Sequence, residues 1–393
     1  MKPKMYLPKD VEYIVSKLLS AGFEAFVVGG AVRDFLLGDT PGDYDITTSA
    51  EPSEIKSVFK NDKTIDTGIK HGTVSVVLNR KPYEITTYRI DGEYLDARHP
   101  ESVSFTRNIA EDLARRDFTV NAMAYNERSG LVDLFSGEED LSCRVIRAVG
   151  LAEKRFEEDA LRILRALRFA SKLDFEIEEK TSRAIFEKAH LLSKVAKERI
   201  YAEWVKLLSG KGAYRIINEY KEIIKLFIPD LGDFILPEKE GFLSLDFELR
   251  FISLFEEAGA QAFVNAADAL RADNKIKLLG KTLLENLCAE LSSEYKMKLI
   301  LSKIGKENTK KLIKLRAVLG KASESEEELF EKIIKSGACF CLADMKASGH
   351  EFAALGIVGK RTGEILAKML DSVMAGEIPN ERAALLSFAV KLK

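Results

Sequence analysis

The chain has 393 residues, of which 46% are hydrophobic and 31% are charged, a composition typical of a globular protein with two to four domains. Its 60 Lys and Arg residues nearly balance 62 Asp and Glu residues, and the net charge of -2 excludes a protein whose overall field attracts polyanions. Binding of a nucleic acid would therefore require a local basic surface.

The cysteines and the apolar runs indicate the cellular compartment. The spacing of Cys143, Cys288, Cys339 and Cys341 fits neither a zinc site nor a disulfide framework, which favours a reducing compartment. No apolar run near the start is long enough for a signal peptide, and no later segment is long enough to span a bilayer. We therefore expect a cytoplasmic protein that does not associate with a membrane.

The N-terminal part of the sequence alternates segments of helical and strand character. Apolar spacing over 11–22 predicts a helix, and the apolar run over 24–30 predicts a short strand that ends in two glycines. The segments 73–79 and 83–90 are rich in β-branched and aromatic residues, and Lys81-Pro82 between them predicts a hairpin turn. This part is expected to form a small mixed sheet with helices packed on it.

From Glu153 onward the strand signal almost disappears, and apolar residues recur three and four positions apart. The segments with this spacing are 156–173, 178–210, 274–292 and 294–305. Gly210-Lys211-Gly212 and the acidic, proline-bearing segment 228–241 mark breaks between helical units. The sequence therefore predicts an α+β fold, in which a mixed-sheet part is followed by an all-α part.

The segment 26–47, FVVGGAVRDFLLGDTPGDYDIT, places two glycines, an arginine and two aspartates close together. A helix that begins after the glycines would have Gly30 at its N-terminus, where free amide groups favour phosphate, and Arg33 one turn later could reach the same anion. Asp43 and Asp45 alternate as strand residues do, so both carboxylates project from one face with Cα atoms about 7 Å apart. Two carboxylates on one face suit Mg²⁺, which also binds substrate phosphates.

Each of these residues also has a plainer interpretation. The glycines can be a simple turn, the aspartates can be turn residues after Pro41-Gly42, and the arginine can be a surface cation. Dinucleotide-binding and P-loop patterns are absent from the sequence. The combination favours a triphosphate beside a carboxylate-bound metal, and hence phosphoryl or nucleotidyl transfer. Glu84, in a strand-like segment, is either a third carboxylate of a two-metal site or the partner of Arg89 or a nearby lysine.

Two clusters of arginines lie further along the chain. Arg115 and Arg116 precede Asp117 and an apolar segment, which favours a structural or phosphate-binding role, with Asp117 suited to orient an arginine. The residues of the second cluster recur every three positions and are Asp159, Arg162, Arg165 and Arg168. They are either the charged face of a solvated helix or a site in which Asp159 and Arg162 present donors and acceptors to a nucleobase.

Taken in order, the motifs GGAVRDFLLG…GDYD, RRDFTVNAMAYN and EDALRILRALRF resemble those of the bacterial class II tRNA nucleotidyltransferases, or CCA-adding enzymes. This family is related to bacterial poly(A) polymerases and to DNA polymerase beta. The segments TGIKHGTVSVV, YEITTYR and DGEYLDARHPESVSF are similar to the CCA-adding branch, and GIVGKRTGEILAKMLDSVMAGEIPNERAALL is similar to the family's tail. The resemblance implies a polymerase beta-like nucleotidyltransferase head at 1–140, a helical neck at 141–208 that recognises the base, a helical body at 209–300 and a helical tail at 301–393.

The resemblance also implies roles for individual residues. The catalytic carboxylates that hold Mg²⁺ are Asp43 and Asp45, with Glu84 as the candidate third acid. The nucleotide-binding residues are Gly30, Arg33, Arg116, Asp159, Arg162, Arg165 and Arg168. Of these, Gly30 and Arg33 would contact the triphosphate, and Arg116 would contribute to nucleotide binding. Asp159 and Arg162 would recognise the base edge, and Arg165 and Arg168 would complete the pocket.

The implied reaction is the addition of C, C and A to the 3′ end of tRNA from CTP and ATP, without a nucleic-acid template. The 3′-hydroxyl attacks the α-phosphate and pyrophosphate leaves. The alternatives are an A-adding enzyme, a CC-adding enzyme, a poly(A) polymerase and a non-catalytic RNA-binding protein. The segment 91–105 argues against the CC-adding subgroup, which the resemblance marks by the loss of part of this region, and the retained aspartates and arginines argue against a loss of catalysis.

Binding of tRNA by a chain of this net charge requires a localised cationic surface. The segment 303–316 carries six basic residues and one acid, and it is either such a surface or a solvated helix face. Its candidate tRNA contacts are Lys310, Lys311 and Lys314. Lys360 and Arg361 lie at an expected helix start, which suits a contact with backbone phosphate. Contacts of this kind would recognise the shape of tRNA more than its sequence.

Overall fold

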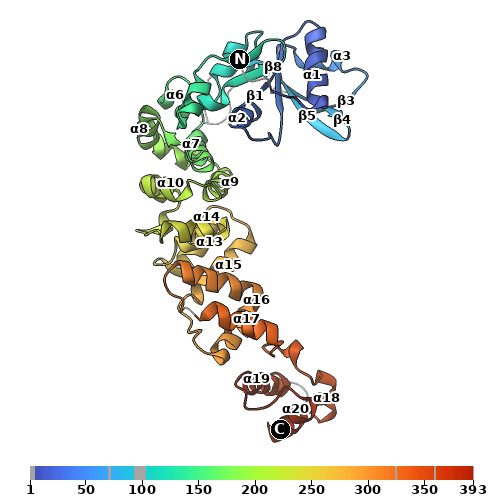
Figure 1. Ribbon diagram of the computed structural model, residues 1–393, viewed down its shortest axis with the longest axis vertical. Helices are drawn as coiled ribbons and strands as arrows, with labels where there is room; N and C mark the ends of the chain where they lie inside the picture. Colours follow the sequence, from blue (N-terminus) through green and yellow to red (C-terminus); the bar gives the residue numbers. More distant parts are fainter. Residues whose placement is uncertain (1–4, 70–71, 93–102, 324, 358–359, 393) are drawn as a thin grey trace. The chain divides into compact units, whose positions relative to one another are not determined.

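The computed structural model describes residues 5–69, 72–92, 103–323, 325–357 and 360–392. Its contacts divide the chain into two compact units, Met1–Pro229 and Asp230–Lys393. The first unit holds the sheet together with helices, and the second is helical (Figure 1). The boundaries expected near residues 140, 208 and 300 stay predictions.

A mixed sheet forms the centre of the first unit, with seven strands among the described residues. The strand order is β3-β4-β5-β2-β1-β8-β9, and β2 runs parallel to β5 while the other neighbouring pairs are antiparallel. The strands are β1 (Ala25–Val28), β2 (Asp45–Thr48), β3 (Lys63–Gly68), β4 (Thr73–Leu78), β5 (Lys81–Thr87), β8 (Met123–Asn126) and β9 (Gly130–Asp133). The sheet confirms the mixed α+β architecture expected from the sequence.

Helices cover the sheet and continue after it along the chain. α1 and α3 contact each other and pack against β1, β4 and β5 (Figure 1). The helices of this unit are α1 (Lys9–Ser20), α2 (Gly30–Leu36), α3 (Pro52–Val58), α4 (Ile109–Ala114), α5 (Gly137–Ser142), α6 (Ala152–Glu158), α7 (Leu161–Leu173), α8 (Glu179–Lys188), α9 (Lys197–Leu208), α10 (Ala213–Glu219) and α11 (Lys221–Phe227). Short 3₁₀ turns are η2 (Thr119–Asn121), η3 (Ala189–Lys194) and η4 (Pro229–Leu231), and the last spans the boundary between the units. Two small pairs complete the strands, β6 (Arg89–Asp91) with β7 (Val103–Phe105) and β10 (Val145–Ile146) with β11 (Glu176–Ile177).

The interior strand β1 is buried on both of its faces. All four of its residues are buried, and successive strand side chains point to opposite faces. Phe26 and Val28 pack with Leu113 of α4, so α4 lies over the face on which these two side chains stand. The same face carries Asp45, because Asp45 is the cross-strand partner of Val28 in the antiparallel register.

Two features lie at positions that differ from the prediction. The loop between β4 and β5 consists of Asn79 and Arg80, whose φ values of 49° and 66° fit a two-residue hairpin turn that matches strand twist. Lys81-Pro82 therefore opens β5 instead of forming the turn. The helix expected over 156–173 is interrupted at Asp159, whose φ of -141° and ψ of 104° are extended, so that α6 and α7 replace a single helix.

The contact between α7 and α9 depends on the predicted glycine-rich break. A Cβ on Gly210 would lie 2.5 Å from the carbonyl carbon of Ser171, so only glycine fits this approach. The backbone N–H of Gly212 donates to the carbonyl of Ser171 at 2.8 Å, and Oγ of Ser171 donates to the carbonyl of Leu207 at 2.6 Å. These contacts bring the charged side chains of α9 to those of α7.

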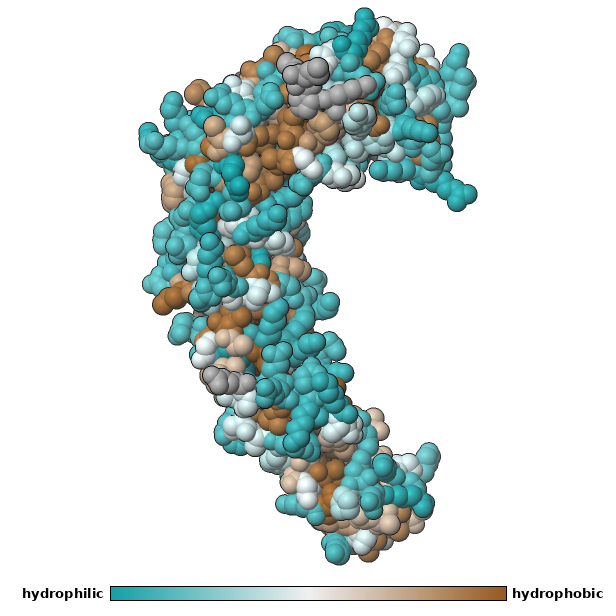
Figure 2. Space-filling view, in the orientation of Figure 1, coloured by the Kyte–Doolittle hydropathy of each residue, from teal (hydrophilic) through white to brown (hydrophobic). Residues whose placement is uncertain are grey.

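The second unit consists of helices and turns throughout its described residues. Its elements are α12 (Lys239–Ser244), α13 (Phe247–Ser253), α14 (Gly259–Ala269), α15 (Asn274–Glu285), α16 (Glu294–Val318), α17 (Glu326–Ser336), η5 (Leu342–Asp344), α18 (Gly349–Ala354), α19 (Lys360–Met374) and α20 (Arg382–Leu392). α16 bends at Gly305, whose φ of 79° and ψ of 165° are not helical. Hydrophilic side chains cover most of this unit's visible surface in Figure 2. Within the described part of the chain, no helix combines the length and apolar character needed to cross a bilayer.

Candidate active site

The turn from β1 into α2 forms one wall of a cavity in the first unit. Gly29 has a φ of 69° and a ψ of -126°, a backbone conformation that L side chains rarely adopt. A Cβ at this position would lie 3.3 Å from Nη1 of Arg116. Gly29 and Gly30 both line the cavity, so a ligand can approach the backbone at the start of α2.

Asp43 and Asp45 lie at the start of β2. Asp45 lines the cavity. Asp43 accepts a hydrogen bond from the backbone N–H of Tyr44 at 2.9 Å. Burial by the surrounding protein and the charge of Asp43 raise the pKa of Asp45, while the charge of Arg116 acts in the opposite direction. The two carboxylates therefore interact electrostatically, as two ligands of one cation would.

Glu84 lies on β5, the strand beside β2. The parallel register pairs Ile46 with Ile85, and the preceding positions, Asp45 and Glu84, therefore lie on neighbouring strands and on the same face. Glu84 is exposed, and no hydrogen bond or ion pair joins its side chain to another described residue. Over the described ranges, no three His, Cys, Asp or Glu side chains are grouped closely enough to hold a metal. Its role as a third catalytic acid stays a prediction.

A buried carboxylate on α4 holds two arginines at the cavity. Oδ1 of Asp112 accepts hydrogen bonds from Nε and Nη2 of Arg115 at 3.0 and 2.7 Å, and Oδ2 accepts from Nη2 of Arg116 at 3.2 Å. Burial opposes the ionisation of Asp112, but the charges and hydrogen bonds of the two arginines outweigh it and hold the pKa of this carboxyl below its usual range. Arg116 is thereby fixed beside Gly29.

Three guanidinium groups surround the ring of Phe169 on α7. The central carbons of Arg33, Arg165 and Arg168 lie 5.2, 5.5 and 3.8 Å from the centre of the ring. The negative face of an aromatic ring attracts cations at such distances. The ring of Phe118 packs edge-on against Phe169, with 5.7 Å between the ring centres, and fixes its position.

Each of these three cations has its own carboxylate. The ion pairs are Arg33 with Asp34 at 2.6 Å, Arg165 with Asp117 at 2.5 Å and Arg168 with Glu203 at 2.6 Å. Burial opposes the charge on Asp117, yet Arg165 holds the pKa of this carboxyl below its usual range. Burial lowers the pKa of Arg168, and the charge of Glu203 counteracts this effect. Separate counter-charges allow the three guanidinium groups to converge.

Asp117 and Asn121 connect arginines from two different elements. Oδ1 of Asp117 accepts a hydrogen bond from Nδ2 of Asn121 at 3.2 Å, and Oδ1 of Asn121 accepts one from Nη1 of Arg33 at 2.7 Å. The prediction that Asp117 orients an arginine is confirmed. The arginine that it orients is Arg165 of α7, however, and not one of the two arginines that precede it in the sequence.

Asp159 and Arg162 have separate partners. Asp159 accepts a hydrogen bond from the backbone N–H of Leu161 at 3.1 Å, and its other oxygen accepts one from Nη2 of Arg199 on α9 at 2.9 Å. Arg162 donates to Glu158 at 2.7 Å and to two backbone carbonyl groups. The interruption of the helix at Asp159 lets both side chains reach the cavity.

The cavity has a volume of about 460 Å³, which is in the range of ligand pockets, and neither Asp43 nor Glu84 is among its lining residues. The basic residues that line it are Arg33, Arg115, Arg116, Arg162, Arg165, Arg168, Lys172 and Arg199. The acidic residues that line it are Asp45, Asp117 and Asp159. Every residue predicted to bind the nucleotide lines this cavity, together with Asp45. The excess of cations suits a ligand as strongly anionic as a triphosphate.

Comparisons with known proteins identify the family. Residues 25–147 match the model of the poly(A) polymerase head domain, and residues 174–231 match that of the probable RNA and SrmB-binding site of polymerase A. The chain is 38% identical over 387 residues to the CCA-adding enzyme of Lactobacillus delbrueckii subsp. bulgaricus, an alignment that covers 95% of this chain and 96% of the relative. The chain belongs to the CCA-adding enzymes.

Solved structures of CCA-adding enzymes have the same architecture. The crystal structure of the Bacillus stearothermophilus enzyme in complex with CTP matches with a TM-score of 0.81 and 33% identity, over 98% of both chains. The Thermotoga maritima enzyme complexed with tRNA shares the fold with a TM-score of 0.72 and 24% identity, over 99% of this chain and 97% of that one. The expected fold and the expected membership among nucleotidyltransferases are confirmed, and the non-catalytic alternative is excluded.

The sequence analysis did not identify four residues of the site: Phe169, Lys172, Arg199 and Glu203. Phe169 has the spacing of an ordinary core residue, and Lys172 has that of a surface cation. Glu203 carried a usable signal, because it is an acid directly before the buried Trp204 in an amphipathic helix. A buried acid requires a cation, although the sequence does not say which one.

Two of the three lysines of α16 that are predicted to contact tRNA already have partners within the protein. Nζ of Lys311 forms an ion pair with Glu248, and Nζ of Lys314 donates to the carbonyl of Ser244 at 2.7 Å, whereas Lys310 is exposed. The predicted side chains that lie outside the described residues are those of Lys360 and Arg361. Residues 93–102, in the segment that argued against a CC-adding enzyme, also lie outside them.

We expect Asp112→Asn to lower the free energy of unfolding by about 3–5 kcal/mol, because it leaves two arginines beside a buried neutral amide. The folded-state pKa of Asp112 is lower than its unfolded value, so this contribution is present above an unfolded pKa of about 4 and is lost as the pH falls through the lower, folded value. Urea unfolding, followed by the fluorescence of Trp204, should give a difference between the two proteins that shrinks in acid. Asp66→Asn, at an exposed aspartate, is the control, and a difference that does not vary with pH would contradict the ionised state assigned to Asp112.

Proposed function

We propose that this chain adds C, C and A to the 3′ end of tRNA from CTP and ATP, without a nucleic-acid template. The observation that carries this proposal is a single cavity that unites Asp45 with the seven residues expected to bind the nucleotide. The 3′-hydroxyl oxygen forms a bond with the α-phosphorus and loses its proton, and the bond from the α-phosphorus to the bridging oxygen breaks. Pyrophosphate leaves with that oxygen. Such transfers depend mainly on positioning and on the stabilisation of charge.

Mg²⁺ is the cofactor that we infer for this site. Its oxygen ligands would come from Asp43 and Asp45, with Glu84 of the neighbouring strand as the third candidate. Asp45 lines the cavity and interacts electrostatically with Asp43, and a divalent cation held by both carboxylates would relieve the repulsion between them. When bound, the metal neutralises the charge that develops on the attacking and leaving oxygens.

Arg33 and Arg116 are the residues that we assign to the triphosphate, next to the backbone of Gly30. Arg33 is held by Asp34 and Asn121, and Arg116 is held by Asp112. Both guanidinium groups are therefore ordered before the nucleotide arrives, and less side-chain entropy is lost when a phosphate binds. The remaining N–H groups of each arginine are available to phosphate oxygens, which accept them in a fork-like geometry.

Asp159 and Arg162 are the residues that we assign to the nucleobase. Cytosine and adenine both present an amino group beside a ring nitrogen that accepts a hydrogen bond. A carboxylate can accept from the amino group while a guanidinium donates to the ring nitrogen, whereas uracil and guanine present the reverse pattern. Arg199 orients Asp159 through one carboxylate oxygen, and the other oxygen accepts from the backbone N–H of Leu161 and keeps a second lone pair for the base. Arg165 and Arg168 complete the pocket.

The second unit is the part that we assign to the tRNA backbone. Lys310 is exposed, and Lys311 and Lys314 follow it on the same helix. Lys360 and Arg361 are further candidates. Contacts of lysine with phosphate release counterions, so the affinity for tRNA should fall steeply with salt. We infer a cytoplasmic location because tRNA, CTP and ATP are all available there.

The nucleotide-addition assay distinguishes the possible products. With tRNA that lacks its terminal CCA, the purified chain should add two C residues from CTP alone and then one A when ATP is supplied. Labelled nucleotides and a sequencing gel count the additions. Failure to use CTP would leave an A-adding enzyme, and a long A tail would indicate a poly(A) polymerase.

Asp45→Ala should reduce the rate of nucleotide addition by about 10²-fold or more, because the site loses a carboxylate ligand of the metal. The affinity for tRNA, measured by filter binding, should stay largely unchanged because the second unit is intact. The matched control is Asp66→Ala, at an exposed aspartate of β3 that pairs with Lys56. Undiminished turnover in Asp45→Ala would remove the metal-binding role from this residue.

Arg162→Ala should reduce the discrimination between CTP and UTP by about tenfold, as expected for a side chain that contributes 1–3 kcal/mol, roughly, to the recognition of a base. The ratio of kcat/KM for the two nucleotides measures this effect. Arg183→Ala is the control, because Arg183 is an exposed arginine of α8 that pairs with Glu179. An unchanged ratio in Arg162→Ala would show that this arginine does not recognise the base.

A further inference from the structure

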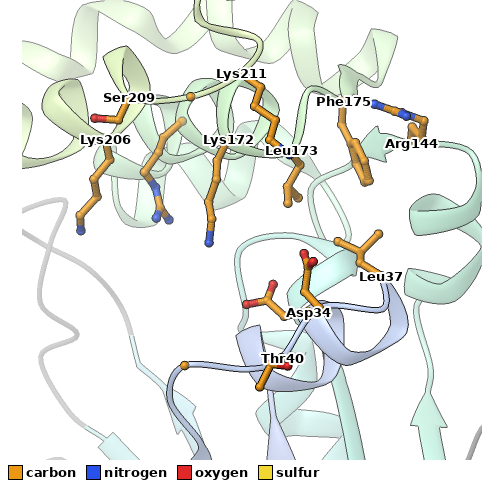
Figure 3. Close-up of a pocket in the computed structure, with 14 residues that line it drawn as sticks. Asp34, Leu37, Thr40, Arg144, Lys172, Leu173, Phe175, Lys206, Ser209 and Lys211 are labelled. Atoms are coloured by element: carbon orange, nitrogen blue, oxygen red, sulfur yellow. The ribbon is translucent and has the colours of Figure 1, made fainter. Parts of the chain in front are cut away.

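A second cavity of the first unit adjoins the nucleotide cavity, and of the residues assigned to the nucleotide only Arg168 lines it. It has a volume of about 1100 Å³ and lies between α7, α9 and the segment that joins α2 to β2 (Figure 3). Arg168 and Lys172 line both cavities, so the two are adjacent. We call this second cavity the side groove, and the charged residues considered below are Arg168, Lys172, Lys206, Asp34 and Asp39.

The two walls of the side groove carry opposite charges. Lys172 of α7 and Lys206 of α9 point from one wall toward Asp34 and Thr40 on the other (Figure 3). Asp39, in the segment after α2, is a second carboxylate among the lining residues. Among the described side chains, neither lysine forms an ion pair with Asp34 or Asp39, so a space separates the walls.

The ion pair of Arg33 with Asp34 lies between the two cavities. Arg33 lines the nucleotide cavity, whereas Asp34, which accepts two hydrogen bonds from its guanidinium group, lines the side groove. Arg168 is held by Glu203 where the two cavities meet, and Lys172 lies one turn further along α7. An anion that leaves Arg33 would therefore meet Arg168 and Lys172 next.

Opposite charges on facing walls fit a ligand that carries anionic oxygens on one side and a bound cation on the other. Mg²⁺ retains several water molecules when it binds phosphates. Phosphate oxygens would then face Lys172 and Lys206, and water molecules on the metal would donate to Asp34 and Asp39. A phosphate without a metal would be repelled by both carboxylates, whether it came from pyrophosphate or from an RNA backbone.

We propose that the side groove binds magnesium pyrophosphate and serves as its path out of the nucleotide cavity. The proposal rests on the proposed function, because nucleotide addition is the step that releases pyrophosphate. Lys206 is suited to this role because its side chain is 59% exposed and its nearest carboxylate, on Glu203, is 3.9 Å away. Lys206 also lies outside the lining of the nucleotide cavity.

Product inhibition tests the side groove separately from catalysis. In Lys206→Ala, the rate of single-nucleotide addition without added pyrophosphate should stay unchanged, and the inhibition constant for added magnesium pyrophosphate should rise about threefold, the effect of one partly exposed cation. Lys180→Ala, at an exposed lysine of α8 outside both cavities, is the control. An unchanged inhibition constant in Lys206→Ala would overturn the proposal while nucleotide addition continued. A wild-type chain that adds no nucleotide would instead overturn the proposed function.

Asp39→Asn distinguishes the metal complex from a bare anion. Loss of this carboxylate should raise the inhibition constant for magnesium pyrophosphate about threefold, because one acceptor for the metal-bound water is lost. If the groove binds phosphate without a metal, removal of a negative charge would lower that constant, which would overturn the proposal. An increased KM for tRNA in Lys206→Ala, with unchanged inhibition by pyrophosphate, would assign the groove to the RNA backbone and overturn it as well.

Discussion

The guanidinium groups of Arg33, Arg165 and Arg168 converge on one ring, and the active site depends on the ion pairs that make this possible. Three like charges around one ring would repel one another strongly in a partly buried site. A separate carboxylate beside each arginine offsets this repulsion, while the aromatic face adds a weaker attraction. The cations are held in place before any ligand arrives. Guanidinium N–H groups that these ion pairs do not use remain available to donate to phosphate.

The origin of these carboxylates explains why the sheet and the following helices form one compact unit. They come from α2, from the segment after α4 and from α9, whereas two of the three arginines stand on α7. The ion pairs therefore require α7 to lie between the sheet and α9. The close approach at Gly210 on one side and the contact between Phe118 and Phe169 on the other satisfy that requirement.

The two adjacent cavities differ in charge, and this difference separates their chemistry. The nucleotide cavity is rich in arginines and has Asp45 at its edge, which suits a triphosphate beside a carboxylate-bound metal. The side groove has lysines on one wall and carboxylates on the other, which suits an anion that has already acquired a cation. The Arg33–Asp34 pair contributes to both cavities. Arg33 lines the nucleotide cavity, and Asp34 lines the side groove through which we propose that the product leaves.

The sequence by itself determined the features that depend on neighbouring residues. The glycine turn, the aspartates of β2 and the arginines of α7 could be predicted because strand alternation, helix period and the order of the family's motifs are all properties of short segments. Only the tertiary structure decided that Asp117 pairs with Arg165, that Glu203 pairs with Arg168 and that the helix is interrupted at Asp159. The hairpin turn at Asn79 and the side groove belong to the same group. Counter-charges are chosen by proximity in space, and a sequence that offers 62 acids to 60 cations does not specify which of them will meet.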